Sequence, residues 1–131
     1  MNFKFCLLVF VMIASPAWAG WEHVAGNIDG VRFLIDYETI RKDGNNVKFW
    51  QLVNYPKPET IGEVTYLSTR SRQEYDCKQE QRRVLTLTAF DNLNAGGKAV
   101  AKEEEPEKWS EIPPKTVVWE IMKKVCKVPV R

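Results

Sequence analysis

The sequence has one histidine and three cysteines among 131 residues, and its formal net charge is only +2. A structural zinc site or a histidine-based catalytic triad needs more partners than His23 offers alone. The balanced charge lacks the basic footprint of a nucleic-acid-binding protein. Beyond residue 19, no apolar run is long enough to cross a bilayer. We therefore predict no metal, no cofactor, no nucleic-acid partner and no membrane span.

The one long apolar run lies at the amino terminus and has the three-part pattern of a secretory signal. Lys4 precedes the apolar residues 5–14, and the segment ends in small residues at Ala17 and Ala19. The alternatives to a signal peptide are an uncleaved membrane anchor and a buried helix. The apolar run is short for a membrane anchor. No cysteine stands at the cleavage point, where a lipid anchor would need one. We predict that residues 1–19 are a signal peptide and that the exported chain, periplasmic or extracellular, carries no lipid.

Export would leave residues 20–131 as a single domain, because so short a chain cannot bury a second core. Cys6 leaves with the signal, so only Cys77 and Cys126 stay in the mature chain. Two cysteines in an oxidising compartment most simply form a disulfide, and these two are too far apart in sequence for a Cys-x-x-Cys redox pair. We predict a Cys77–Cys126 bond. Closing a ring of this length is expected to stabilise the folded protein by about 4 kcal/mol.

Alternating apolar residues predict strands at 31–40 and 47–55, joined by the turn-forming residues 42–46. The second strand is rich in apolar residues on both faces, which is typical of a central strand. Pro56 and Pro58 are expected to end it, because proline cannot donate to a ladder.

The next two strands are predicted at 62–78 and 84–90, antiparallel and with their turn near Lys78–Gln81. Short strands at 22–26 and 98–101 complete a set of about six, the last of them after a loop at 91–97. The charged run at 102–108 fits a solvated loop better than an interaction tail.

The carboxy-terminal segment 113–127 changes to a helical period. Its apolar residues fall on one face of an amphipathic helix of about three to four turns: Val117, Val118, Ile121, Met122 and Val125. Prolines are tolerated in the first turn, and the lysines lie at the negative end of the helix. We predict an α+β fold, in which the helix packs on one face of a single antiparallel sheet and the disulfide joins the two.

The sequence contains no strong catalytic constellation. Glu74 and Asp76 fall on one face of a strand and could in principle act as paired carboxylates. Cross-strand pairing with arginines of the same hairpin is the simpler interpretation of both residues. We predict that the protein is not an enzyme.

A binding module is the class that the remaining residues favour. The candidate binding residues form a basic hairpin: Arg70, Arg72, Lys78, Arg82 and Arg83. Candidate aromatic contacts are Trp50, Tyr55, Tyr66 and Trp109, since arginine and aromatic residues are frequent hot spots. Core packing is the alternative for the aromatics, and a solvated sheet face is the alternative for the arginines. Charge reversal at Arg82 and Arg83 is expected to weaken binding and to leave stability nearly unchanged.

Several short segments, taken in their order along the chain, resemble the surface-adhesin protein E family of small exported proteins from Gram-negative bacteria. These segments are Asp36…Thr39-Ile40, Val47/Trp50/Leu52/Tyr55, Ser68…Glu74-Tyr75-Asp76-Cys77, and Trp109…Ile112-Pro113-Pro114 before a helix that ends near Cys126. The resemblance covers nearly the whole mature chain. It implies a six-stranded antiparallel sheet backed by a carboxy-terminal helix, in agreement with the periodicity.

The resemblance also implies adhesion. The founding member of the family is an outer-membrane lipoprotein that binds host extracellular-matrix proteins and plasminogen. This chain departs from that pattern because it lacks a lipid-attachment cysteine. We predict a small exported protein that binds host matrix proteins. The alternative is a soluble periplasmic structural or inhibitory partner of another bacterial protein, and a homodimer is a further option.

Overall fold

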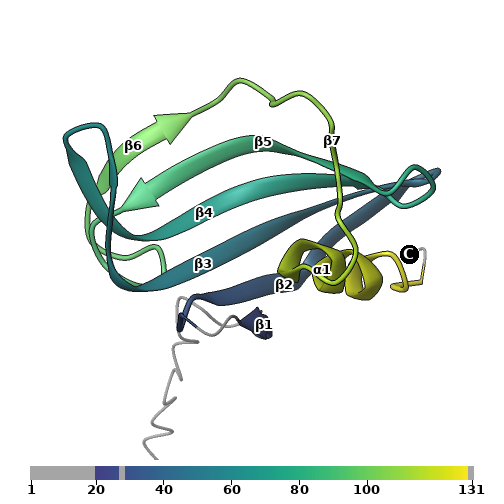
Figure 1. Cartoon of the computed structure of the whole chain (residues 1–131), viewed down its shortest axis with the longest axis horizontal. Helices are drawn as coiled ribbons and strands as arrows, with labels where there is room; N and C mark the ends of the chain where they lie inside the picture. Colours follow the sequence, from purple (N-terminus) through teal and green to yellow (C-terminus); the bar gives the residue numbers. More distant parts are fainter. Residues whose placement is uncertain (1–19, 27–28, 130–131) are drawn as a thin grey trace, which may run out of the picture.

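The computed structural model describes residues 20–26 and 29–129. The chain forms one twisted antiparallel sheet, and a short helix lies against one face of it near the carboxy terminus (Figure 1). This arrangement confirms the predicted α+β fold. The predicted signal peptide, residues 1–19, lies outside the described residues.

Six strands follow one another across the sheet in chain order, each antiparallel to the next. They are β1 (Trp21–Gly26), β2 (Arg32–Asp43), β3 (Asn46–Ile61), β4 (Val64–Asp76), β5 (Gln81–Phe90) and β6 (Ala99–Glu103). A seventh strand, β7 (Ser110–Glu111), pairs with the first residues of β5. The sequence pattern does not predict β7, because two residues are too few to show a period.

Strand β3 continues through Pro56 and Pro58, so the prediction that these prolines end it is wrong. Pairing with β4 lapses between Asn54 and Glu59 and then resumes. On its other side, β3 pairs with β2 no further than Asn54. The prolines therefore occupy positions where no ladder hydrogen bond is needed, and irregularities of this kind are where strands accommodate proline.

Strand β2 contains an irregularity between Asp36 and Arg41, where its pairing with β3 is interrupted. The side chain of Thr39 bridges the two strands at this point. The Thr39 hydroxyl donates to the carbonyl oxygen of Asp36 (2.6 Å) and accepts from the backbone N–H of Trp50 (3.1 Å). Backbone groups that the bulge would leave unpaired are thereby satisfied. Ile40, the next residue, is buried in the core.

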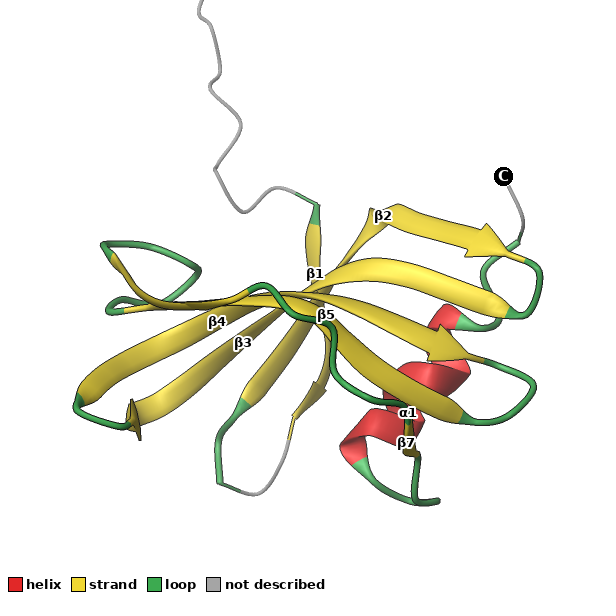
Figure 2. Ribbon diagram, turned by 90° about the horizontal axis from the view of Figure 1, so that it is seen from above, coloured by secondary structure: helices red, strands yellow, loops and turns green. Residues whose placement is uncertain are grey.

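The main core lies between helix α1 (Val117–Val125) and one face of the sheet, which we call the helix face. Three helix residues are buried in it, Ile121, Met122 and Val125, and they pack on sheet residues that include Ile35, Val47, Phe49 and Tyr75. Figure 2 shows that α1 lies against one end of the fanned strands only. Burying an aliphatic side chain of this size contributes about 1.5–3 kcal/mol, so much of the stability depends on the helix staying in place.

The helix has nine residues and is shorter than the predicted three to four turns. It begins at Val117 because Thr116 caps it, with its hydroxyl accepting a hydrogen bond from the backbone N–H of Trp119 (3.2 Å). Pro113 and Pro114 precede the cap instead of lying in the first turn, so that part of the prediction is also wrong. A threonine that supplies an acceptor to the first free N–H groups is a stronger start signal than proline.

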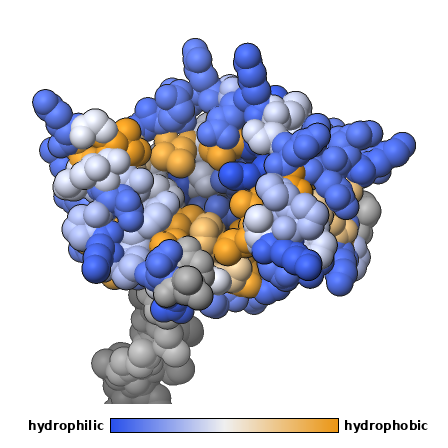
Figure 3. All heavy atoms as spheres, in the orientation of Figure 1, coloured by the Kyte–Doolittle hydropathy of each residue, from blue (hydrophilic) through white to orange (hydrophobic). Residues whose placement is uncertain are grey.

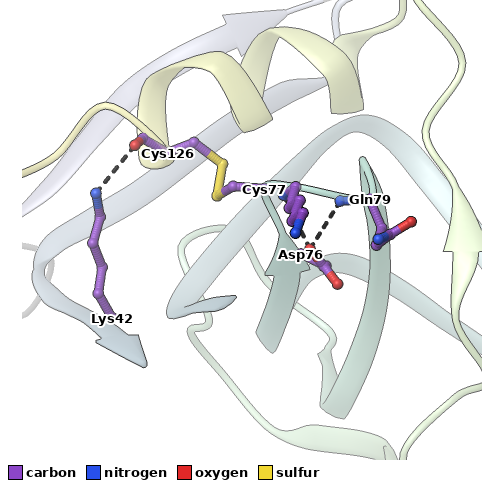
Figure 4. Close-up of a disulfide and its surroundings, with 6 residues drawn as sticks. Lys42, Asp76, Cys77, Gln79 and Cys126 are labelled. Carbon is purple, nitrogen blue, oxygen red and sulfur yellow. Dashed lines mark hydrogen bonds between the residues drawn. A yellow bond between two sulfur atoms is a disulfide. The ribbon is translucent and has the colours of Figure 1, made fainter. Parts of the chain in front are cut away.

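A disulfide joins Cys77, just after β4, to Cys126 at the end of α1, with 5.9 Å between the two Cα atoms. This confirms the predicted pair. Figure 4 shows how both ends are held. Asp76 accepts hydrogen bonds from the backbone N–H groups of Lys78 (3.0 Å) and Gln79 (2.9 Å), and Lys42 Nζ donates to the Cys126 carbonyl oxygen (3.1 Å). The bond thus ties the helix to a turn whose shape Asp76 sets.

Candidate functional site

The outer face, the side of the sheet opposite α1, carries two of the predicted binding residues side by side. Arg70 and Arg72 are both exposed and lie two positions apart on β4, so they point to the same side. Cross-strand pairing places Arg70 next to Leu52 and Arg72 next to Trp50. Neither arginine forms an ion pair with an acidic residue in the described part of the chain.

Aromatic rings hold Arg70 in place. Its guanidinium carbon lies 5.7 Å from the centroid of the Trp50 ring and 5.4 Å from that of Phe90. A cation above an aromatic face is stabilised by about 0.5–1 kcal/mol at an exposed site. Trp50 is half-buried, so it packs into the sheet and also supports an exposed arginine. The core-packing alternative for Trp50 therefore applies at least in part, and its role as a contact for a partner stays a prediction.

Arg83 also lies on the outer face, but a buried acid holds its charge. It stands directly opposite Glu74, and its Nη2 and Nε both lie 2.7 Å from Glu74 Oε1. Glu74 is only 4% exposed and also accepts a 3.4 Å hydrogen bond from Asn46 Nδ2. The Arg83 guanidinium carbon lies 4.7 Å from the centroid of Trp109, which is 36% exposed. Arg83 is therefore a structural partner as well as a candidate contact.

The other two predicted binding residues lie elsewhere. Arg82 pairs with Tyr75 across the strands, which puts it on the helix face, where it donates to Gln73 Oε1 (3.3 Å). Lys78 lies in the turn after β4. Consecutive strand residues point to opposite faces, so the structure splits the basic hairpin and leaves Arg70 and Arg72 as its one close exposed pair.

The two carboxylates of the hairpin have separate structural roles. Glu74 pairs with Arg83, which confirms the predicted cross-strand ion pair. Asp76 instead accepts from backbone N–H groups of the turn, so its predicted pairing with an arginine is wrong. A side chain two residues before a turn is well placed to bond the turn's own backbone, which competes with a cross-strand partner. Neither carboxylate is set up as a general acid or base.

A cavity of about 250 Å³ opens at the end of the sheet far from the helix. Its lining includes Arg32, Asn54, Tyr55, Pro56, Leu93 and Asn94. The ring of Tyr55 meets that of Tyr66 edge-on with 5.5 Å between centroids. Burial raises the pKa of the Tyr55 hydroxyl above its ordinary value. Sequence reasoning identified Tyr55 and Tyr66 as candidates but missed the loop that supplies Leu93 and Asn94.

The helix face beyond α1 is hollowed, and Figure 3 shows apolar residues at the sides of the hollow. Alternation along the strands places buried polar side chains on this face, among them Gln51, Ser71 and Gln73. Gln73 Nε2 donates to Ser71 Oγ (2.7 Å). These three residues are at most 6% exposed, so they offer little surface to a ligand. Gln51 Oε1 is buried here without a hydrogen-bond partner.

Within residues 20–26 and 29–129, there is no cluster of three or more histidine, cysteine, aspartate or glutamate side chains that could hold a metal ion. Over the same ranges, no helix has the length and hydrophobicity to cross a membrane. The prediction that no cofactor is used stays a prediction.

The fold defines a class of small α+β domain, one antiparallel sheet with a helix tied to it by a disulfide. Residues 21–127 match the family model described as surface-adhesin protein E. The chain therefore belongs to the surface-adhesin protein E family, as the sequence motifs indicated.

Solved structures of protein E from Haemophilus influenzae have the same fold. Crystal form II gives a TM-score of 0.66 at 19% identity, over 82% of this chain and 87% of that one. The structure from a non-typeable strain gives a TM-score of 0.62 at 19% identity, over 86% of this chain and 78% of that one. No curated protein matches this chain in sequence. At such low identity the structural likeness shows the fold alone.

Proposed function

We propose that the chain is an exported, non-enzymatic binding protein and that its outer face contacts acidic regions of host extracellular-matrix proteins. The observation that carries this proposal is the exposed pair Arg70 and Arg72, which no described acidic residue neutralises. Membership of a surface-adhesin family supports the class of function.

The geometry suits recognition more than folding. Stacking between Trp50 and Phe90 restricts Arg70 before any partner arrives, so less side-chain entropy is lost on binding. Exposed cations steer an acidic partner and set orientation, and arginine and tryptophan are the residue types most often found at hot spots. An acidic surface placed over β4 would meet both guanidinium groups at once.

The alternative partner is another bacterial protein in the periplasm, which the outer face could bind through the same contacts. The predicted release without a lipid anchor favours this alternative, since a released protein is a poor tether between cell and host.

Reversing both charges, in Arg70→Glu with Arg72→Glu, should weaken binding to immobilised laminin or vitronectin at least about tenfold. The loss should shrink as salt is raised, because screening already weakens the attraction in the unmodified protein. Surface plasmon resonance at several salt concentrations measures both effects. The matched control is Lys115→Glu with Lys127→Glu, an equal charge change at exposed positions on either side of α1.

Equal weakening in the control would mean that net charge alone drives binding. If the unmodified protein binds neither matrix protein, the adhesin proposal fails. Capture of a periplasmic protein that Arg70→Glu with Arg72→Glu no longer retains would then support the alternative partner.

Export itself has a direct test. Expressed in a Gram-negative host, the mature protein should begin at Gly20 and carry no acyl group, because the predicted signal ends at Ala19 without a lipid-attachment cysteine. Intact-mass measurement distinguishes this product from its alternatives. A mass that includes residues 1–19, or an added lipid, would contradict the predicted processing.

A further inference from the structure

We propose that the partner segment bound by the outer face is an extended acidic peptide with one bulky apolar side chain, such as leucine or phenylalanine, that enters the cavity beside Leu93. This inference rests on the proposed function, because the cavity residue Asn54 pairs with Ser68, two residues before Arg70 on β4. It adds the chemistry of the partner and the place where the partner is anchored.

The size of the cavity fits a single side chain. Its volume of about 250 Å³ lies below the roughly 300–1,000 Å³ typical of pockets for whole small molecules. Pro56 and Leu93 supply apolar walls, while Arg32 adds a positive charge to the lining. A cavity with apolar walls and a cation suits an apolar side chain whose neighbours are acidic.

Leu93 is presented by an ordered loop. It is 43% exposed, one of three large hydrophobic residues that the described part of the chain leaves open to solvent. Asn54 Nδ2 donates to Asn94 Oδ1, and the Asn94 backbone N–H donates to Asn54 Oδ1, both at 2.8 Å. Ser68 Oγ donates to the Asn92 carbonyl oxygen (2.6 Å).

The backbone of this loop is held in an unfavourable conformation. Asn94 and Ala95 have positive φ angles of 60° and 55°, a region that costs a residue other than glycine free energy. Ala95 is fixed there by a 2.9 Å hydrogen bond from its N–H to Ser68 Oγ. A loop that is strained yet well bonded, with an exposed leucine in it, is pre-organised for contact with a partner.

The strand register connects the cavity to the arginines. Asn54, which lines the cavity, pairs with Ser68 on β4. Arg70 and Arg72 follow Ser68 at spacings of two residues on the same side of the strand, so each step is about 7 Å. An extended peptide repeats its side chains at the same interval. Acidic residues two and four positions from the apolar anchor would therefore reach Arg70 and Arg72.

Two fluorescent synthetic peptides test the inference by anisotropy. Both carry acidic residues two and four positions to either side of a central residue, which is leucine in one peptide and alanine in the other. The leucine peptide should bind the unmodified protein about tenfold more tightly, because only its side chain fills the cavity. Leu93→Ala should reduce this ratio to less than about twofold, while Ile61→Ala, a matched change at a 47% exposed residue outside the cavity lining, should leave it unchanged.

The arginine variant separates anchoring from charge. In Arg70→Glu with Arg72→Glu, both peptides should bind more weakly and the ratio between them should persist. Equal binding of the two peptides to the unmodified protein, no binding of either, or an unchanged ratio in Leu93→Ala would each overturn the inference.

The same measurements distinguish this failure from failure of the proposed function. Matrix-protein binding that depends on Arg70 and Arg72 but shows no leucine preference leaves the proposed function standing without the cavity. A leucine preference without any matrix-protein binding supports the cavity and rejects the host partner.

Discussion

Replacing both disulfide cysteines, in Cys77→Ser with Cys126→Ser, should lower the free energy of unfolding by about 2–5 kcal/mol. This is a large share of the roughly 5–15 kcal/mol expected for a small domain. The bond closes a ring between residues 49 positions apart, and without it the unfolded chain gains conformational freedom. Chemical denaturation of the variant and the parent under oxidising conditions measures the difference.

The damage should appear first at α1. A helix of nine residues is too short to be stable alone in water, so it depends on packing Ile121, Met122 and Val125 against the sheet. Chain ends are loosely held unless a specific contact fixes them, and here the disulfide at Cys126 fixes the end of the helix. Hydrogen exchange should therefore accelerate in residues 117–126 of the double variant before it does in β3 and β4.

Reduction of the unmodified protein is the control, because it breaks the same bond without changing any residue. It should reproduce most of the loss seen in the double variant. A double variant that melts at the temperature of the parent would contradict the prediction. Free thiols found by alkylation of the unreduced protein would contradict the bond itself.

Arg83→Ala should lower the free energy of unfolding by about 2 kcal/mol. The change leaves the carboxylate of Glu74 buried without its ion partner, and breaking a buried pair from one side typically costs about 3–5 kcal/mol. We expect less here because the Arg83 side chain is 31% exposed and solvent screens the pair. This corrects the expectation that charge reversal at Arg82 and Arg83 leaves stability nearly unchanged.

Two further variants isolate the cause. Arg72→Ala removes a neighbouring exposed arginine on the same face and should change stability by no more than about 0.5 kcal/mol. Adding Glu74→Gln to Arg83→Ala removes the stranded charge and should recover part of the lost stability. Equal stability of Arg83→Ala and Arg72→Ala in urea unfolding would show that the Glu74–Arg83 pair is not a buried ion pair in solution.

The strands, the apolar face of the helix and the disulfide were predictable, because they follow from the local spacing of apolar residues and from the number of cysteines. Alternation along β2 and the helical spacing of Ile121, Met122 and Val125 report directly which side chains are buried. The pairing of Cys77 with Cys126 followed from the prediction that Cys6 leaves with the signal peptide, so that each of the two had one possible partner. Motifs spread along the chain were also sufficient to indicate the family.

Boundaries were less predictable, because neighbouring strands decide them. A proline ends a strand only where a neighbouring strand needs an N–H donor at that position. Neither β2 nor β4 pairs with β3 at Pro56 or Pro58, so the strand continues. The two residues of β7 form a strand only because β5 offers them an edge. Thr116 is a favourable N-cap residue and could have indicated the start of α1. The prediction instead placed the preceding prolines in the first turn.

The sequence by itself determined the α+β class, the crosslink and the kinds of residue available for binding, since these follow from composition, period and cysteine count. Tertiary structure alone decided which of those residues act together. The strand pleat sends Arg82 to the helix face and Arg83 to Glu74, and it leaves Arg70 and Arg72 exposed as neighbours. The cavity has Asn54 and Leu93 in one lining although they are distant in sequence, and hydrogen bonds from Asn54 and Ser68 hold the loop there. Sequence spacing records the order of side chains along one strand, whereas contacts across strands depend on register and on loops that close over them.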